Sequence, residues 1–311
     1  MWRLAGRRLA GLVLVMAVAV LVTFAAIRAL PGDPVAVMLS DHSADVEMAT
    51  RLRAEYGLDR SLPAQFAAYV SDIARLRFGL SFRFVHMPVA EVLRDSLVVS
   101  PVLALAALSV AMALGVLGGI VSAIHRNRFQ DTAIIVLLVA GLSIPNFAVA
   151  TFLVYFLSVK LSLLPVAGWG SLRQAVLPVL VLAIPSAAYI ARLSRTFMLE
   201  VLQQDFVRTA RAKGLPERLV IWRHALRNIL VPLATSAGII FGGLLSNTVV
   251  VETIFNIPGL GRLAIDSIFA RDYPVAMAVV LLFVLFFALI NLLADVICGL
   301  VDPRLLRERA A

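Results

Sequence analysis

The chain has 311 residues, of which 61% are hydrophobic and 15% are charged, and its mean hydropathy is +0.95. A soluble domain carries roughly 45–50% apolar and about 25% charged residues, so the composition excludes an ordinary water-soluble globular protein. The net charge of +9 is compatible with nucleic-acid binding, but it is equally expected of a membrane protein whose cytoplasmic loops are basic.

Six segments are apolar and long enough to cross a bilayer as helices. A hydrocarbon core of about 30 Å requires roughly 20 apolar residues in a helix, and backbone groups in lipid must be paired within the segment. The predicted spans are residues 9–27, 97–124, 132–157, 175–191, 229–251 and 275–300. Arginines precede the first span as in a signal peptide, but its apolar run exceeds the about 7–15 residues of a signal core, so we interpret it as an uncleaved helix.

The distribution of basic residues predicts the orientation. If the N-terminus is cytoplasmic, the cytoplasmic segments hold most of the arginines, whereas the two short outer loops hold only Lys160, Arg173, Arg262 and Arg271. Basic residues in short loops favour the cytoplasmic side, so both termini are expected inside, and the positive charge requires no nucleic acid. The predicted organisation is an N-terminus with the first helix in 1–30, a periplasmic insertion in 31–96, a helical core in 97–300 that includes a cytoplasmic loop in 195–228, and a cytoplasmic tail in 301–311.

Two outer segments are expected to be structured. In the insertion, the amphipathic stretch 62–76 predicts a small helical cap. Between the last two spans, residues 251–274 contain turn formers such as Asn256, Pro258 and Gly259. These residues favour a re-entrant or interfacial hairpin, with a plain surface loop as the alternative.

The longest cytoplasmic connection has the residues of a short capped helix. Asp205 suits the N-cap, residues 206–213 suit a helix, and Gly214 suits the left-handed position past its end. The small side chains of Ala210 and Ala212 would let another surface approach closely. Such a segment either lies on anionic lipid as an amphipathic helix or docks a cytoplasmic partner.

Prolines and amides stand out within the spans. Pro178 and Pro185 are expected to bend or interrupt the fourth span, which leads directly into the loop, and Pro232 is expected where the fifth span begins. Asn146 follows a proline in the third span, and Asn247 lies in a polar cluster of the fifth. Polar residues within spans are candidates for a substrate path, so Asn146 and Asn247 are the possible path residues. Hydrogen bonding between helices is the alternative role.

The sequence contains no constellation for catalysis or nucleotide binding. The phosphate-binding pattern GxxxxGK[ST] is absent, and His42, His86, His125 and His224 lack the spacing of metal ligands. We therefore expect no metal, no cofactor and no enzymatic activity. The glycine-rich stretch 114–119 is apolar and indicates close helix packing instead.

Short motifs run in order along nearly the whole chain. They read LPGDP at 30–34, YGLD at 56–59, FGLS at 78–81, SIPNF at 143–147, RTARAKGL at 208–215, RHALRN at 223–228, ETIF at 252–255, IPGLG at 257–261 and DPR at 302–304. Together they resemble the permease subunits of ABC importers, in the dipeptide/oligopeptide/nickel branch, and specifically the first (B-type) permease of such systems. Arg208 stands where the general family pattern has Glu, which leaves open any role of that carboxylate.

The resemblance implies an all-α polytopic membrane protein of the type I ABC-importer permease fold, with six transmembrane helices and a periplasmic insertion after the first. It implies a bacterial inner-membrane subunit that moves peptides or a related small solute into the cytoplasm. The implied partners are ATP-binding subunits, a second homologous permease and a periplasmic or extracytoplasmic solute-binding protein. The loop would couple to the ATPase through Asp205, Ala210, Arg211, Lys213, Gly214 and Leu215. The alternative is an ion-coupled secondary transporter, which predicts an inverted repeat and charges at the membrane midplane, and neither is evident.

Overall fold

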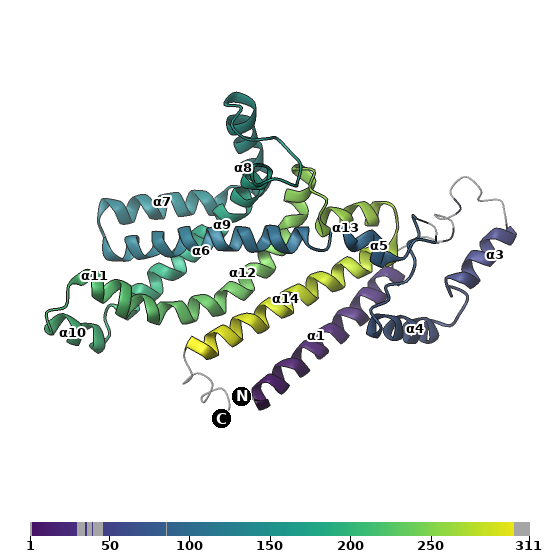
Figure 1. Cartoon of the computed structure of the whole chain (residues 1–311), viewed down its shortest axis with the longest axis horizontal. Helices are drawn as coiled ribbons and strands as arrows, with labels where there is room; N and C mark the ends of the chain where they lie inside the picture. Colours follow the sequence, from purple (N-terminus) through teal and green to yellow (C-terminus); the bar gives the residue numbers. More distant parts are fainter. Residues whose placement is uncertain (1, 30–34, 36–38, 40–45, 85, 302–311) are drawn as a thin grey trace. The chain divides into compact units, whose positions relative to one another are not determined.

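The computed structural model describes residues 2–29, 35, 39, 46–84 and 86–301 (Figure 1). In these residues the backbone is helical apart from turns, loops and an isolated bridge between Leu80 and Pro88, so the all-α prediction is confirmed. The helices are α1 (Trp2–Ala29), α3 (Val46–Glu55), α4 (Leu62–Ala74), α5 (Val89–Arg94), α6 (Val99–Ile124), α7 (Phe129–Ser143), α8 (Asn146–Leu153), α9 (Leu172–Val201), α10 (Asp205–Ala212), α11 (Glu217–Leu219), α12 (Leu226–Ile254), α13 (Leu260–Phe269) and α14 (Tyr273–Val301), with π-helical turns η2 (Val154–Lys160) and η3 (Val220–Ala225).

Helices occupy all six of the predicted spans. Within the described residues, four stretches are long and apolar enough to cross a membrane, and α7 with α8–η2 makes a fifth if that bent pair is one span. The four are Val89–Ile124, Leu172–Val201, Glu217–Ile254 and Tyr273–Ala294. Helix α1 contributes a shorter apolar stretch, Ala10–Ala26. The number of spans is therefore four or five by length and composition, and six stays a prediction.

The third predicted span is a broken helix. Helices α7 and α8 meet at a bend of 104°, so the prediction of one continuous helix over 132–157 is wrong, whereas the prediction of a span there is not contradicted. Ile144 has extended backbone angles (φ −89°, ψ 124°) because the ring of Pro145 disfavours a helical conformation in the preceding residue. Pro145 is then the N-cap of α8, and Asn146 is its first residue.

The prolines of α9 and α12 do not interrupt their helices. Helix α9 continues through Pro178 and Pro185, and α12 contains Pro232 as an internal residue. Of the two predicted effects on the fourth span, the interruption is absent and the bend stays a prediction. Neighbouring helices and local adjustment can satisfy the backbone groups that a proline frees. The start of α9 is well defined, since Ser171 and Gln174 form a reciprocal capping box.

One compact unit is built around α9, from residues 102–257 and the end of α14. Helix α9 contacts α7, α8 and α12, and Val181 and Ile190 along it are fully buried. Helix α6 approaches it closely at Gly115, where an added Cβ would lie 2.7 Å from the Ile190 Cβ. The predicted packing role of the stretch 114–119 is thereby confirmed at this glycine.

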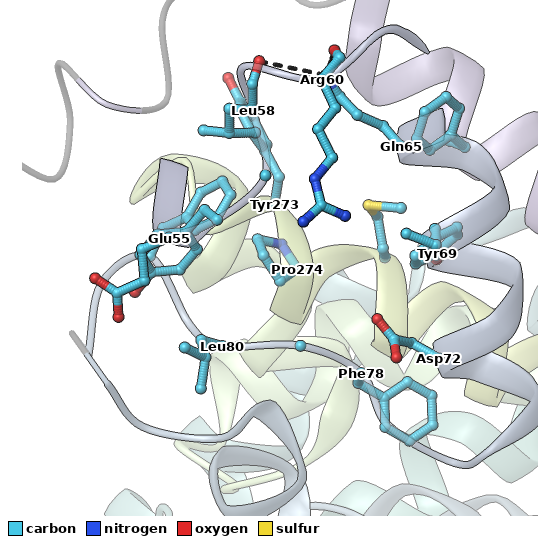
Figure 2. A pocket seen from close by; sticks show the side chains of 17 residues that line it. Glu55, Leu58, Arg60, Gln65, Tyr69, Asp72, Phe78, Leu80, Tyr273 and Pro274 are labelled. Carbon is cyan, nitrogen blue, oxygen red and sulfur yellow. Dashed lines mark hydrogen bonds between the residues drawn. The ribbon is translucent and has the colours of Figure 1, made fainter. Parts of the chain in front are cut away.

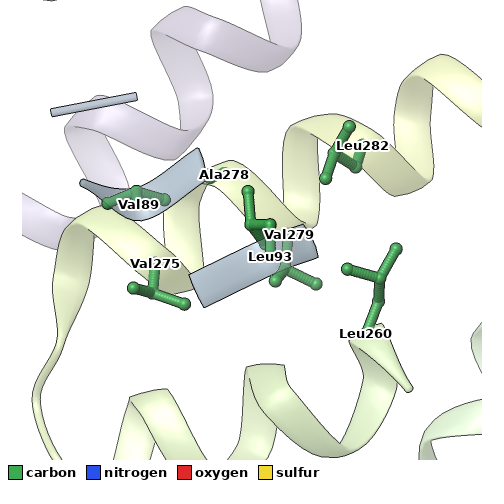
Figure 3. Packing of buried hydrophobic residues seen from close by; sticks show 7 residues of the cluster. All are labelled: Val89, Leu93, Leu260, Val275, Ala278, Val279 and Leu282. Carbon is green, nitrogen blue, oxygen red and sulfur yellow. The ribbon is translucent and has the colours of Figure 1, made fainter. Parts of the chain in front are cut away.

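A second compact unit contains residues 2–101 and 258–288. The predicted helix of the insertion is present as α4, and the connection 251–274 contains helix α13. Helices α5, α13 and α14 share an apolar core (Figure 3), which consists of Val89, Leu93, Leu260, Val275, Ala278, Val279 and Leu282.

A buried carboxylate fastens the insertion to the loop between α13 and α14. Asp272 is 1% exposed and accepts hydrogen bonds from the Ser81 hydroxyl and from the backbone N–H groups of Phe82 (3.0 Å) and Arg83 (3.3 Å). Hydrogen bonds to a charged group are stronger than neutral ones. Asp272 therefore sets the position of the segment 81–83 within this unit.

Candidate functional site

The candidate coupling segment is a helical turn, here called the α10 turn (residues 205–220). Helix α10 begins at Asp205, and its N-cap is Gln204, whose backbone is extended (φ −70°, ψ 150°). The prediction that Asp205 is the N-cap is therefore wrong by one residue. As the first helical residue, Asp205 still places its carboxylate at the positive end of the helix dipole. The Oδ1 atom of its exposed side chain lies 3.6 Å from Nη1 of Arg208.

The end of α10 is a Schellman motif. Gly214 adopts the predicted left-handed conformation (φ +73°). Its N–H donates to the Arg211 carbonyl (2.9 Å), and the Leu215 N–H donates to the Ala210 carbonyl (3.3 Å), which is the paired pattern that closes a helix on glycine. No atom lies within 4 Å of a Cβ built on Gly214, so glycine is needed here for its backbone conformation and not for space.

The α10 turn has its own small core. Val207, Ala210 and Val220 are buried together, and Leu215 packs against them. Ala210 is 6% exposed, so its small side chain makes room within the turn and does not lie on the outer surface. A hydrophobic contact such as that of Leu215 with this cluster commonly accompanies a Schellman motif, and here it packs the end of α10 against the rest of the turn.

An ion pair braces the α10 turn from the outside. The Arg211 guanidinium donates to both carboxylate oxygens of Glu217, with distances of 3.1 Å from Nε and 2.6 Å from Nη2. The hydrogen bonds to Glu217 raise the pKa of Arg211 above its already high usual value. Both side chains are about half exposed, so this brace stabilises the turn by at most about 1 kcal/mol.

The outward surface of the α10 turn includes an exposed aromatic ring. Phe206 is 41% exposed, and Thr209, Ala212 and Lys213 are exposed beside it. Phe206 was not singled out from the sequence, although a large apolar residue directly after a helix start in a charged loop is a usable signal. The exposed surface of the turn thus combines an apolar ring, small side chains and the basic residues Arg208, Arg211 and Lys213.

The α10 turn is joined rigidly to the span that follows. From Glu217 to Ile254 the chain is helical without interruption, through α11, the π-helical turn η3 and α12. Val220, Ile221 and Ala225 are buried along its beginning. This helix begins at Glu217, so Pro232 lies inside it, and the entry of the fifth span at Pro232 stays a prediction.

The helix that precedes the α10 turn is held by a buried ion pair that sequence reasoning missed. Arg195 in α9 donates to both oxygens of Asp131 at the start of α7, with distances of 2.9 Å from Nε and 2.8 Å from Nη2. The Ser122 hydroxyl and the Asn127 N–H also donate to Asp131, the latter over 3.0 Å. Asp131 is 3% exposed, so the pair ties the ends of α6, α7 and α9 together. The sequence signal that could have indicated this pair is the acidic residue Asp131 directly before an apolar segment.

Comparison with known proteins establishes the family. Residues 115–307 match the family described as binding-protein-dependent transport system inner membrane component, and residues 1–95 match the N-terminal family of such membrane components. The chain belongs to this family.

Relatives of the permease match it over nearly the whole length. It is 39% identical over 297 residues to the glutathione transport system permease protein GsiC of Escherichia coli (strain K12), with 96% of each chain covered. It is 38% identical over 307 residues to the probable peptide ABC transporter permease protein y4tP of Sinorhizobium fredii (strain NBRC 101917 / NGR234), with 96% of the permease and 97% of that protein covered.

A solved structure agrees on the fold. A chain from the inward-facing structure of the MetNI methionine ABC transporter superposes with a TM-score of 0.57 at 19% sequence identity, covering 68% of the permease and 96% of that chain. The permease is thus the membrane subunit of an ABC importer, a multi-pass protein of the inner membrane and not itself an enzyme. Importers of this family work with ATP-hydrolysing and solute-binding partners, and the alternative of an ion-coupled transporter is not favoured.

The possible path residues lie in different settings. Asn146 is partly exposed at the start of α8, directly after the break at Pro145. Asn247 is exposed on α12, and its amide donates to the Gly243 carbonyl four residues earlier (2.9 Å). Both belong to the unit around α9, and neither is part of the α10 turn.

Proposed function

We propose that this permease imports short peptides, or a related small solute such as glutathione, into the cytoplasm. The observation that carries the proposal is the pair of whole-length relatives, since one is named for glutathione and the other for peptides. Glutathione is itself a peptide, so the two names agree on one chemical class. Within that class, specificity would be shared with the solute-binding protein.

The α10 turn is the part that we propose to couple transport to ATP hydrolysis. Its Schellman end at Gly214, its internal core around Ala210 and Leu215, and the brace from Arg211 all support a rigid body that moves as one piece. Lys213 and the first turn at Asp205 would face the ATPase subunit together with the exposed Phe206. Because the turn continues into α12, a push on it would be transmitted to a span.

The remaining assembly follows from the same proposal. The permease would pair with a second homologous permease, keep both termini in the cytoplasm and place the insertion (31–96) and the connection 251–274 toward the solute-binding protein. The core 97–300 would carry the solute past Asn146 and Asn247. The basic residues gathered in 192–228 support this orientation.

Replacing Gly214 tests the coupling role. Tryptophan at this position adds a bulky ring on the outer surface, where no atom lies within 4 Å of its Cβ, at a cost of about 1–2 kcal/mol for the left-handed backbone. Asparagine tolerates that backbone better and adds little bulk, so Gly214→Asn is the matched control. We expect Gly214→Trp to abolish both uptake and solute-stimulated ATP hydrolysis in the reconstituted importer, and Gly214→Asn to retain most of both.

The two parts of the proposal fail separately. Normal ATPase stimulation and normal uptake by Gly214→Trp would contradict coupling through the α10 turn. Stimulated ATP hydrolysis without uptake of a labelled dipeptide, tripeptide or glutathione by the unchanged importer would contradict the peptide substrate and leave the coupling role standing.

A further inference from the structure

The unit that contains the insertion has a partly open cavity of about 390 Å³ (Figure 2). Its walls come from α1, the end of α3 with the loop that follows, α4, the segment 78–82 and the start of α14. This volume lies in the range of about 300–1,000 Å³ that small-molecule sites occupy. The cavity is separate from the α10 turn and from the possible path residues, which belong to the other unit.

Opposite charges project into this cavity from different walls. Figure 2 shows the Arg60 guanidinium reaching in from the loop after α3 and the Asp72 carboxylate facing the same space from α4. Among the described residues neither side chain has an ion-pair partner, and the two do not pair with each other. The other acid of the lining, Glu55, already contacts His86 (Nδ1 to Oε1, 3.1 Å). The cavity thus offers one positive and one negative group with space between them.

The Arg60 side of the cavity is held in place by its surroundings. The Gln65 amide donates to the Arg60 carbonyl (2.7 Å) and the Leu58 carbonyl (3.3 Å), which fixes the loop backbone at the start of α4. Gly57 is left-handed (φ +63°), and the Arg60 Nε would lie 3.7 Å from a Cβ placed on it. The loop backbone that carries Arg60 is therefore fixed, and the exposed Arg60 side chain lies close to Gly57.

Aromatic rings and one unsatisfied hydroxyl complete the lining. Tyr69 packs on Phe24 with ring centres 5.9 Å apart, and Tyr56, Phe82 and Tyr273 form a chain of edge-on ring contacts. The Tyr69 hydroxyl oxygen is buried without a hydrogen-bond partner. Burial raises the pKa of Tyr69, so the hydroxyl stays protonated and available as a donor. A buried hydroxyl without a hydrogen-bond partner is unfavourable, and an acceptor on a ligand would supply the missing bond.

We propose that this cavity binds a short zwitterionic peptide. The carboxylate end would pair with Arg60, the ammonium end with Asp72, and an apolar side chain would lie against the aromatic walls, with the Tyr69 hydroxyl donating to a peptide carbonyl. Arg60 and Asp72 lie too far apart to form an ion pair with each other, and the two charges of a peptide are likewise separated, by at least one peptide unit, whereas those of a free amino acid are not. The choice of a peptide rests on the proposed function, whereas the choice of a ligand with one positive and one negative group rests only on the charges that line the cavity.

Binding is tested by calorimetry on the full-length permease in lipid nanodiscs, with the dipeptide Ala-Phe as the probe. The same dipeptide acetylated at its amino end and amidated at its carboxyl end removes both charges, and free phenylalanine brings the charges together. We expect Ala-Phe to bind at least tenfold more tightly than either. Arg60→Gln and Asp72→Asn should each weaken it at least tenfold, whereas Asp59→Asn, an exposed charge change in the same loop that lies outside the cavity lining, should leave it unchanged.

Tyr69→Phe separates a ligand role from a structural one. The ring and its packing remain, and the unsatisfied hydroxyl is removed, so the variant is expected to unfold at the same or a higher temperature and yet bind Ala-Phe several-fold more weakly. Equal affinity for the capped and uncapped dipeptide, or unchanged affinity in Arg60→Gln and Asp72→Asn with unaltered melting temperatures, would overturn the proposal. Tighter binding of phenylalanine than of Ala-Phe would overturn the choice of a peptide. Calorimetry reports binding whether or not the importer carries peptides in an uptake assay, so this proposal and the proposed function fail independently.

Discussion

Replacing Arg195 with methionine is expected to destabilise the permease through a buried charge. The Asp131 carboxylate is 3% exposed, and Arg195 supplies two of its hydrogen bonds, at 2.9 Å and 2.8 Å. Methionine keeps much of the apolar stem of arginine but removes the guanidinium. The change therefore leaves Asp131 buried without its counter-charge while disturbing the surrounding packing little.

The magnitude follows from what remains around Asp131. Removing one partner of a buried pair typically costs about 3–5 kcal/mol. Here the Ser122 hydroxyl and the Asn127 N–H still donate to the carboxylate, and the Arg195 side chain is 25% exposed, so the lower end, about 3 kcal/mol, is expected. At roughly 2–4 °C per kcal/mol for larger domains, the unfolding midpoint should fall by about 6–12 °C.

Thermal unfolding of the purified permease in nanodiscs measures this shift. Arg192→Met is the matched control, because Arg192 is exposed on the same helix and only lies over the Tyr189 ring at 5.4 Å, an interaction of about 0.5–1 kcal/mol. Adding Asp131→Asn to Arg195→Met should recover part of the loss, since no buried charge then remains. If Arg195→Met unfolds no earlier than Arg192→Met, or the double variant is no more stable than the single one, the reasoning is refuted.

Two further predictions concern packing and the insertion. Gly115→Ala should lower the unfolding midpoint by the equivalent of about 1–3 kcal/mol, because its Cβ would lie 2.7 Å from the backbone of α9. Gly118→Ala should have little effect, since the nearest atom to its Cβ would be 3.8 Å away. Equal midpoints for the two variants would contradict the close approach of α6 and α9. Asp272→Asn should expose the segment that this carboxylate anchors to limited proteolysis, since an amide oxygen accepts hydrogen bonds less strongly than a carboxylate. Asp266→Asn, an exposed change on α13, should leave the cleavage pattern as it is, and an unaltered pattern in Asp272→Asn would count against the anchor.

Local signals in the sequence predicted much of the α10 turn. The left-handed glycine at 214 and the short helix before it are confirmed, because the end of a helix depends on a few neighbouring residues. The direction of Ala210 was not predictable in this way. Its side chain faces inward because Val220, on the other side of the turn, packs against it, and that contact is made only when the chain has folded back.

Proline shows the same limit within the spans. Pro145 breaks a predicted helix, while Pro178 and Pro185 lie inside a continuous one. The residue type is identical, so its local effect on the preceding backbone cannot decide the outcome. In α9 the contacts with α7, α8 and α12 hold the helix together despite the lost hydrogen bonds.

The sequence by itself determined that this chain is a helical membrane protein, because apolar runs of membrane length and helix-end motifs act over short stretches of chain. The expectation of a permease came from the resemblance of its ordered motifs to a known family. Only the tertiary structure decided that Arg195 meets Asp131, that Asp272 holds the insertion, and that Arg60 and Asp72 share a cavity. These contacts depend on how the helices pack. Where the two residues are far apart in the sequence, no local pattern of residues indicates which one is the partner.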